Sequence, residues 1–467
     1  MIGALYRLGE QKVRPGVYVR WYDDGDLATI TGAIGIAASI IKSNWGPLGQ
    51  VIKIENAEDV HKKIGTGYGS DVVSEMFRGG AYTVLAVRVG LGGDHGEAIL
   101  KDTEGLDALK IQTKYPSSRQ FTVTVRDSLN ENEREFIVFE NDRQLEKLVF
   151  SKEGNEIENL ASMINASSTI FQASTIEGGG NSLGSVSNES VTGGSDPQIT
   201  AQDYIDAFGV IEREFFDGIT VDTEDPAIHA SLQAFVNRKL QEGFRFIGVV
   251  GEKISVPFNT RKDNARAFNS FTMVYVGNGY SVGDRDLDGA LAAGRALGMM
   301  VSNSYKTSLT KKPVQGSTGV YGELTSEQYN EAVKNGMLVF SSNPDGLAQI
   351  DYGINTLVSP TGDEDEGWKK IRRVRTRFEL IDRIAFTLDR AIGSGEGIPN
   401  SNDGRQFVIT VANGIINDMI REGGLESGEL VVDESNPPQG DSAWFKFQDL
   451  VDLDGIEKLY LAFGFKY

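Results

Sequence analysis

The final ten residues of the chain, KLYLAFGFKY from Lys458 to Tyr467, place the strongest constraint on its fold. Large apolar side chains alternate with smaller or polar ones, which is the pattern of a half-buried β-strand. Chain ends fray unless a partner holds them, so a strand this apolar requires pairing. It is either an inner strand of the chain's own sheet or a strand added to a neighbouring molecule. The face predicted to be buried consists of Leu459, Leu461, Phe463, Phe465 and Tyr467.

A second alternating strand lies near the other end of the chain. Its apolar positions are Val13, Val17, Val19 and Trp21. Pro15 has no backbone N–H to donate, which suits a sheet edge or the first residue of a strand. The two terminal strands therefore either pair with each other or each add to a sheet edge of another molecule.

Charge and composition exclude several classes of partner. The chain has 467 residues, a formal net charge of −20 and no cysteine. Nucleic acid and anionic membranes are poor partners for so acidic a surface. The longest apolar stretch, about residues 30–41, is too short to span a bilayer. We expect a soluble chain that folds in a reducing cytoplasm.

Secondary-structure patterns predict a multidomain protein with α/β and β parts. Alternating strands and helices over 200–350 indicate a three-layer α/β core with a mostly parallel sheet. Residues 177–195, rich in glycine and serine, indicate a flexible linker that closes a β-rich insertion. The expected organisation is an N-terminal strand arm (1–27), a small α/β segment (28–94), the β-rich inserted domain (95–195), the α/β core (196–360), a helical part (361–432) and a C-terminal strand arm (433–467).

The C-terminal arm is expected to contain a spacer and a hairpin. Residues 432–442 are polar and carry Pro437-Pro438, which is typical of a semi-rigid extended spacer. Strands over 444–453 and 456–467 would then be joined at Asp454-Gly455, a strong hairpin signal.

Possible metal and catalytic residues have simpler structural explanations. Asp284, Asp286 and Asp288 match the first half of a calcium loop, but position twelve is Arg295 rather than glutamate. Acidic residues at a helix N-terminus are favoured by the helix dipole in any case.

Asp222, Glu224 and Asp225 follow a predicted strand, where α/β enzymes place catalytic groups. No nucleophile or glycine fingerprint accompanies them, and Pro226 indicates the first turn of a helix that they cap. We therefore predict no catalytic, cofactor-binding or metal-binding residues.

One basic cluster stands out in the acidic chain. Most charge runs are solvated faces, and three acidic residues lie just upstream at 364–366. The local reversal of sign nevertheless predicts contact with an acidic protein partner. The cluster consists of Lys369, Lys370, Arg372, Arg373, Arg375 and Arg377.

Several stretches resemble the sheath proteins of contractile phage tails and R-type bacteriocins. They are RPGVYVR (14–20), Trp45-Gly46-Pro47, FRGGAYTVLAVRV (77–89), QIDYGINTL (349–357), GEGIPNSNDGRQ (395–406) and DGIEKLYL (454–461). QIDYGINTL and DGIEKLYL match the family pattern most closely. The order of these stretches and their placement at both ends make the set specific. They lie outside the insertion at 95–195, to which the resemblance assigns no role.

The resemblance implies a structural protein without enzymatic activity or cofactor. Terminal arms would add strands to neighbouring subunits, which form stacked rings around a tail tube, and contraction would drive the tube through a bacterial envelope. The implied partners are further copies of the chain, the tail tube (the acidic candidate for 369–377), and the baseplate and tail terminator proteins. The implied location is the virion tail or bacteriocin particle, assembled in the host cytoplasm. The alternatives are an enzyme that uses the 200–350 domain, or a capsid or surface-layer protein.

Overall fold

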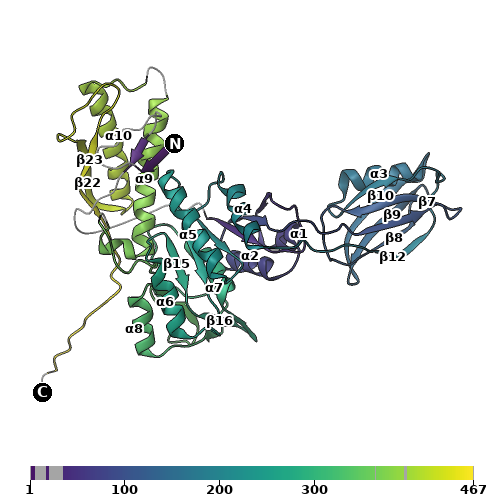
Figure 1. Ribbon diagram of the computed structural model, residues 1–467, viewed down its shortest axis with the longest axis horizontal. Coiled ribbons are helices and arrows are strands. Elements are labelled where there is room, and N and C mark those ends of the chain that lie inside the picture. The colour runs from purple at the N-terminus through teal and green to yellow at the C-terminus, as the bar shows by residue number, and fades with distance from the viewer. Residues whose placement is uncertain (1, 6–16, 20–34, 363, 394–396, 466–467) are drawn as a thin grey trace.

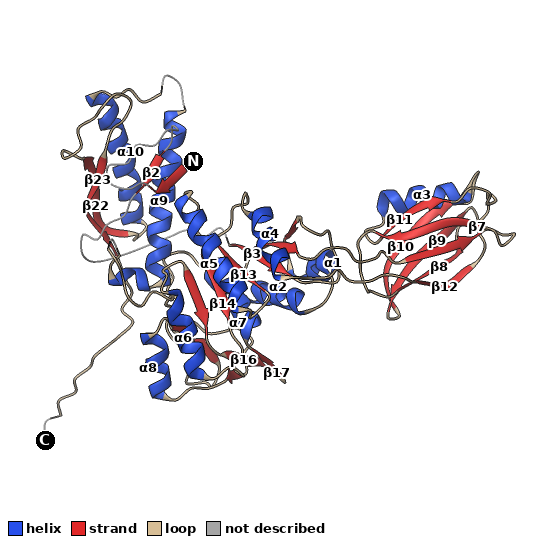
Figure 2. Ribbon diagram, viewed as in Figure 1, coloured by secondary structure: helices blue, strands red, loops and turns tan. Residues whose placement is uncertain are grey.

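The computed structural model describes residues 2–5, 17–19, 35–362, 364–393 and 397–465. The chain is elongated: a helical C-terminal part and a central α/β part adjoin, and a β-rich unit projects from the far side of the central part (Figure 1). The C-terminal residues leave the body as an extended tail. The mixed α/β character expected from the sequence is confirmed (Figure 2).

The largest sheet lies in the central part. Its order is β19-β15-β14-β13-β3-β5-β4, and only the edge strand β4 runs antiparallel to its neighbour. Strands β5, β13, β14 and β15 are buried at every residue, as expected of a parallel sheet covered on both faces. The strands are β3 (Ile36–Ile41), β4 (Val51–Ile54), β5 (Thr83–Arg88), β13 (Gly218–Val221), β14 (Ile247–Gly251), β15 (Met273–Val276) and β19 (Met337–Leu338).

Helices cover this sheet on both sides, and each side has its own apolar cluster. Helices α2 (Tyr68–Gly79) and α7 (Gly289–Val301) pack into one cluster, while α4 (Ala201–Ile211) and α5 (Pro226–Gln241) pack into the other. A Cβ at Gly298 would lie 2.1 Å from the Met76 carbonyl oxygen, so α7 approaches α2 this closely only with glycine there.

Smaller elements complete the central part, and several were not expected from the sequence. They are α1 (Val60–Ile64), α6 (Phe258–Phe268), α8 (Ser326–Lys334), β16 (Gly279–Val282), β17 (Arg285–Leu287), β18 (Gly319–Tyr321), β20 (Phe340–Ser342) and β21 (Ala348–Ile350).

The insertion contains two sheets, of order β10-β9-β8-β12 and β11-β7-β6, that share one apolar cluster with helix α3. Strands β8 and β9 form an antiparallel hairpin in the first of these sheets. The expected glycine-rich linker is wrong in part, because the run contains β12, which pairs with β8 and buries Val191. The elements are β6 (Glu97–Lys101), β7 (Asp107–Thr113), β8 (Phe121–Asp127), β9 (Glu133–Glu140), β10 (Arg143–Ser151), α3 (Glu156–Ser167), β11 (Phe171–Thr175) and β12 (Val186–Val191).

The C-terminal part consists of α9 (Ile371–Ile392), α10 (Asn402–Arg421) and the antiparallel pair β22 (Leu425–Val432) and β23 (Phe445–Asp452). The expected hairpin at Asp454-Gly455 is wrong. Strand β23 pairs back onto β22, because both strands contribute apolar side chains to the cluster beneath α10. Residues 432–442 therefore belong to the turn region of this hairpin and are not a spacer leading to the terminal segment.

The described N-terminal residues form a small parallel sheet of β1 (Ile2–Leu5) and β2 (Val17–Val19). It lies beside α9. The predicted arm residues Val17 and Val19 thus lie in a strand whose described partner is β1. Val13 and Trp21 fall outside the described residues.

Candidate functional site at the root of the C-terminal segment

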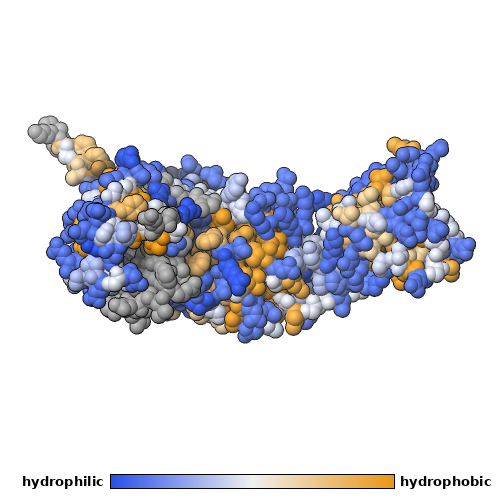
Figure 3. Space-filling model, turned by 90° about the horizontal axis from the view of Figure 1, so that it is seen from above, coloured by the Kyte–Doolittle hydropathy of each residue, from blue (hydrophilic) through white to orange (hydrophobic). Residues whose placement is uncertain are grey.

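The last described residues, 453–465, contain no helix or strand and project from the body (Figure 3). Their large apolar side chains face solvent, although exposed apolar surface is costly in water. The exposed fractions lie between 74 % and 90 % for Ile456, Leu459, Tyr460, Leu461, Phe463 and Phe465. Four predicted arm residues are therefore exposed together, and Tyr467 lies outside the described residues.

This segment is attached to the body by ion pairs at its first residues. Asp452, the last residue of β23, accepts two hydrogen bonds of 2.7 Å from the Arg373 guanidinium. Arg377 approaches the same carboxylate at 3.0 Å. Burial opposes ionisation of Asp452, but Arg373 and Arg377 outweigh it and hold the pKa of the carboxyl below its usual value. A planar guanidinium held in two places orients the strand end as well as binding it.

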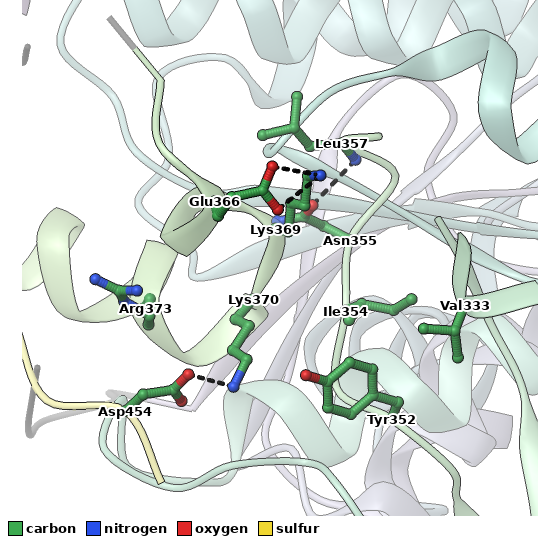
Figure 4. Close-up of a pocket in the computed structure, with 10 residues that line it drawn as sticks. All are labelled: Val333, Tyr352, Ile354, Asn355, Leu357, Glu366, Lys369, Lys370, Arg373 and Asp454. Atoms are coloured by element: carbon green, nitrogen blue, oxygen red, sulfur yellow. Dashed lines mark hydrogen bonds and ion pairs between the residues drawn. The ribbon is translucent and has the colours of Figure 1, made fainter. Parts of the chain in front are cut away.

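A second contact lies two to five residues further along the chain, at Asp454 and Glu457. Lys370 forms an ion pair with Asp454 (Figure 4). It forms a second ion pair with Glu457 at 2.7 Å, and Ser308 donates to Glu457 at 2.6 Å. Burial lowers the pKa of Lys370, yet the two carboxylates more than reverse this and raise it. We call the set formed by Lys370, Arg373, Arg377, Asp452, Asp454 and Glu457 the C-terminal clamp.

The remaining basic residues of the predicted cluster are also engaged within the chain. Lys369 pairs with Glu366 at 2.8 Å, and the buried Arg375 donates to the Asn303 carbonyl at 2.8 Å. Arg372 lies over Gly455, where an added Cβ would come within 2.8 Å of its Nη1. The cluster predicted to contact an acidic partner therefore directs much of its charge toward carboxylates of its own chain.

The stretch QIDYGINTL contacts the chain next to the clamp, at Trp368 and Lys370. Ile354 forms a β-bridge with Lys370, and the buried Asn355 donates to the Trp368 carbonyl at 2.6 Å. These residues line a hollow of about 320 Å³ that Asp454 borders (Figure 4). The two stretches with the closest family resemblance, 349–357 and 454–461, thus meet at Lys370.

Sequence reasoning missed the clamp carboxylates. Asp454 was interpreted as a turn residue, whereas its carboxylate binds an amine 84 residues earlier in the chain. The sequence did contain one signal. The three closely spaced carboxylates Asp452, Asp454 and Glu457 match in number the basic residues that they pair with at the start of α9. Pairing over such a separation is not readable from one sequence.

The acidic residues near the core strands have structural partners. Asp222 is buried and accepts from the Tyr204 hydroxyl at 2.5 Å and the Lys42 amide at 2.6 Å. Burial raises its pKa to about 6. Asp225 caps α5, with Pro226 in the first turn, as predicted.

The half-matched calcium loop has a similar explanation. Asp286 accepts from the Ser281 hydroxyl at 2.6 Å, and Asp288 accepts from the Ile254 amide at 2.9 Å at the start of α7. Within the described ranges, no group of three or more histidine, cysteine, aspartate or glutamate side chains is arranged to hold a metal ion. None of the described helices is both long and apolar enough to cross a membrane.

Comparison with known proteins confirms the resemblance to tail sheath proteins. Residues 197–356 match the family described as phage tail sheath protein central domain. The phage-like element PBSX protein XkdK of Bacillus subtilis (strain 168) is 25% identical over 485 residues, which cover 98% of this chain and 99% of that protein. The uncharacterized protein YqbK of the same organism is 24% identical over 432 residues, 88% of each chain.

Solved structures share the fold over nearly the whole chain. The sheath tail protein from Desulfitobacterium hafniense has a TM-score of 0.70 at 20% identity, with coverage of 94% of this chain and 100% of its own. The sheath tail protein Lin1278 from Listeria innocua has a TM-score of 0.67 at 18% identity, with coverage of 93% and 97%. The contracted helical sheath of the anti-feeding prophage has a TM-score of 0.52 at 12% identity, with coverage of 97% and 99%.

Proposed function

We propose that this chain, which carries a phage tail sheath protein central domain in residues 197–356 and shares the fold of solved sheath tail proteins, is the structural subunit of a contractile sheath. It would polymerise as stacked rings around a tail tube and contract to drive that tube through a bacterial envelope. The observation that carries the proposal is the exposed apolar segment 456–465, held at its root by the C-terminal clamp. No enzymatic step is needed.

The segment is proposed to complete a sheet of a second copy. Backbone N–H and C=O groups of an extended segment bind an open sheet edge, and alternating side chains fill pockets beside it. The β22–β23 pair of the second copy is the proposed acceptor. Each of these strands has one edge without a strand partner in the described part of the chain. The N-terminal strand, with Val13, Val17, Val19 and Trp21, is proposed to join such a sheet as well.

Contraction requires subunit bodies to move while the lattice stays connected. The three-layer core would move as a body, and the terminal arms would keep the connections. The clamp supports this division, since it fixes where the segment leaves its own subunit and leaves residues 458–465 without described partners for their apolar side chains. In the virion tail or bacteriocin particle, baseplate and terminator proteins would contact the ends of the lattice.

Contact between the tail tube and the 369–377 cluster stays a prediction. Lys370, Arg373 and Arg377 already face carboxylates of this chain, so a tube contact through them would compete with the clamp. Glutamate substitution at Lys369, which lies outside the clamp, tests the contact separately: weaker co-assembly on tubes supports it, and unchanged co-assembly contradicts it.

Deletion of residues 456–467 tests the assembly role. We expect a folded subunit with unchanged circular dichroism that forms no tubes in negative-stain electron micrographs. Tubes of normal length, or an unfolded subunit, would show that the segment belongs to its own subunit. Shells or flat lattices from the full chain would favour the capsid or surface-layer alternatives.

Point substitutions sharpen this test by comparing the two faces of the segment. Leu461→Ser with Phe463→Ser removes apolar side chains from the face predicted to be buried. The matched control, Tyr460→Ser with Ala462→Ser, changes the opposite face. We expect the first pair to abolish tube formation and the second to reduce it far less. Equal effects would contradict pairing of an alternating strand.

A further inference from the structure

The insertion is joined to the core by two chain segments that pair with each other. Antiparallel bridges connect Leu91 with Gln198 and Asp94 with Ser195 before the first sheet of the insertion begins. Figure 1 shows the β-rich unit projecting from the core through this narrow connection. An isolated two-stranded ribbon is only marginally stable and does not by itself hold a domain at a fixed angle.

A tryptophan of the core extends into the insertion. Trp45 lies in the loop between β3 and β4, yet it is 2% exposed within the apolar cluster of the insertion. Its ring meets Tyr115 edge-on at 5.2 Å and Phe121 at 5.6 Å between centroids. The Arg119 guanidinium lies 5.0 Å from the Trp45 ring. Such edge-to-face contacts have a preferred geometry, so they fix orientation as well as distance.

Polar contacts surround this tryptophan on the core side. The guanidinium of Arg88, fully buried at the end of β5, donates to the carbonyls of Ser43 and Gly46 at 2.8 Å and to that of Pro116 at 2.9 Å. It thereby binds the Trp45 loop and the β7–β8 loop of the insertion to the same strand end. The Ser117 hydroxyl adds a bond to the backbone carbonyl of Asn44.

We propose that Trp45 is a latch that fixes residues 95–195 in one orientation on the core, so that the insertion and the core move as one rigid body. The inference goes beyond the sheath role, because it concerns a contact within one subunit and holds whether or not the chain assembles. In an assembly, any surface of the insertion would keep its direction relative to the core through every rearrangement of the lattice.

Pulsed electron paramagnetic resonance tests the latch. The chain has no cysteine, so Lys62→Cys on α1 and Glu158→Cys on α3 place spin labels on the core and the insertion of an otherwise unchanged full-length chain. We expect one narrow distance distribution with Trp45 present. Trp45→Ala should broaden it about twofold or more, since the ribbon and the remaining hydrogen bonds of Arg88 and Ser117 do not fix the angle. Trp45→Leu, which keeps some apolar contact, should broaden it less.

Phe150→Leu is the matched control, because Phe150 is an equally buried aromatic residue of the same cluster without a ring contact to Trp45 among the described residues. It should leave the distribution narrow. A narrow distribution in Trp45→Ala, or equal broadening in Phe150→Leu, overturns the latch. Loss of the fold of the insertion in Trp45→Ala, seen by protease digestion throughout 95–195, would show that Trp45 completes that domain's own fold, and would also overturn it.

Discussion

The insertion and the C-terminal segment both project from the body, but they are attached by opposite kinds of contact. Trp45 holds the insertion through buried aromatic packing, supported by hydrogen bonds to backbone carbonyls. The C-terminal segment is held at its root by the ion pairs of the clamp, and its apolar side chains beyond the root are exposed. A domain packed in this way keeps its orientation. A segment held only at its root is free to pair elsewhere.

Substitution of Arg373 should have the largest effect on stability. The effect should be confined to the C-terminal part of the molecule. Arg373→Ala leaves the buried Asp452 without its main partner, and removal of one member of a buried pair costs about 3–5 kcal/mol. We expect the free energy of unfolding, measured in urea, to fall by about this amount. Hydrogen exchange should become faster in β22 and β23 but not in residues 95–195.

Lys369→Ala is the control for that substitution. Its pair with Glu366 is solvent-exposed, so the free energy of unfolding should change by less than about 0.5 kcal/mol. If Arg373→Ala changed the free energy of unfolding as little as Lys369→Ala, the clamp would not hold the strand end.

Acid should release the C-terminal segment while leaving the latch in place. The pKa values of Asp452 and Glu457 lie below their ordinary values of 3.8 and 4.5, so their pairing contributes stability above these values and loses it as pH falls through the lower folded-state values. Lys370, with its pKa raised above 10.5, contributes below that value and loses its contribution only at higher pH. The clamp is therefore complete at neutral pH.

Hydrogen exchange of the β23 residues Phe445–Asp452 between pH 7 and pH 3, corrected for intrinsic rates, checks this expectation. Protection should fall toward the acid end, because protonation of Asp452 removes its pairing with Arg373 at the end of this strand. The distance between the spin labels at positions 62 and 158 should stay unchanged over the same range, because the packing of Trp45 does not depend on protonation. Protection that is constant with pH would contradict the role of the carboxylates.

Salt should have the smallest effect and the same selectivity. At 1 M salt the screening length is about 3 Å, which weakens the partly exposed pair of Lys370 with Asp454. A modest rise in exchange at the end of β23 is expected, together with an unchanged label distance across the latch. If salt changed only the label distance across the latch, ionic contacts would hold the insertion and not the C-terminal segment. That result would contradict the assignment of the two kinds of attachment.

Local pattern accounts for what the sequence predicted well. Helix α9 lies in the part predicted to be helical (361–432), and the alternation of strands and helices over 200–350 indicated the mostly parallel sheet that contains β13 and β14. The alternation after Lys458 also marked the segment whose large apolar side chains are exposed. Each of these features depends on residues that are close together in the chain.

Long-range contacts account for what was missed. Pairing of Lys370 with Asp454 joins residues far apart in sequence, and the Asp454-Gly455 hairpin signal was overruled when β23 packed onto β22 and α10. Trp45 was visible only as part of a turn, because the aromatic residues that surround it lie at 115 and 121. Periodicity reports which face of an element is apolar, but not which distant element covers it.

Isotope-mixed cross-linking tests the central claim most directly. Light and heavy-nitrogen chains carrying Leu461→Cys are assembled together and treated with a linker that joins cysteine to lysine, with Lys446 in β23 as the expected target. The claim predicts 461–446 links between light and heavy chains in the proportion of random pairing. A link from Glu158→Cys to Lys152 of the insertion, in a parallel sample, stays within one isotope. Links from 461 that join only chains of the same isotope would contradict it.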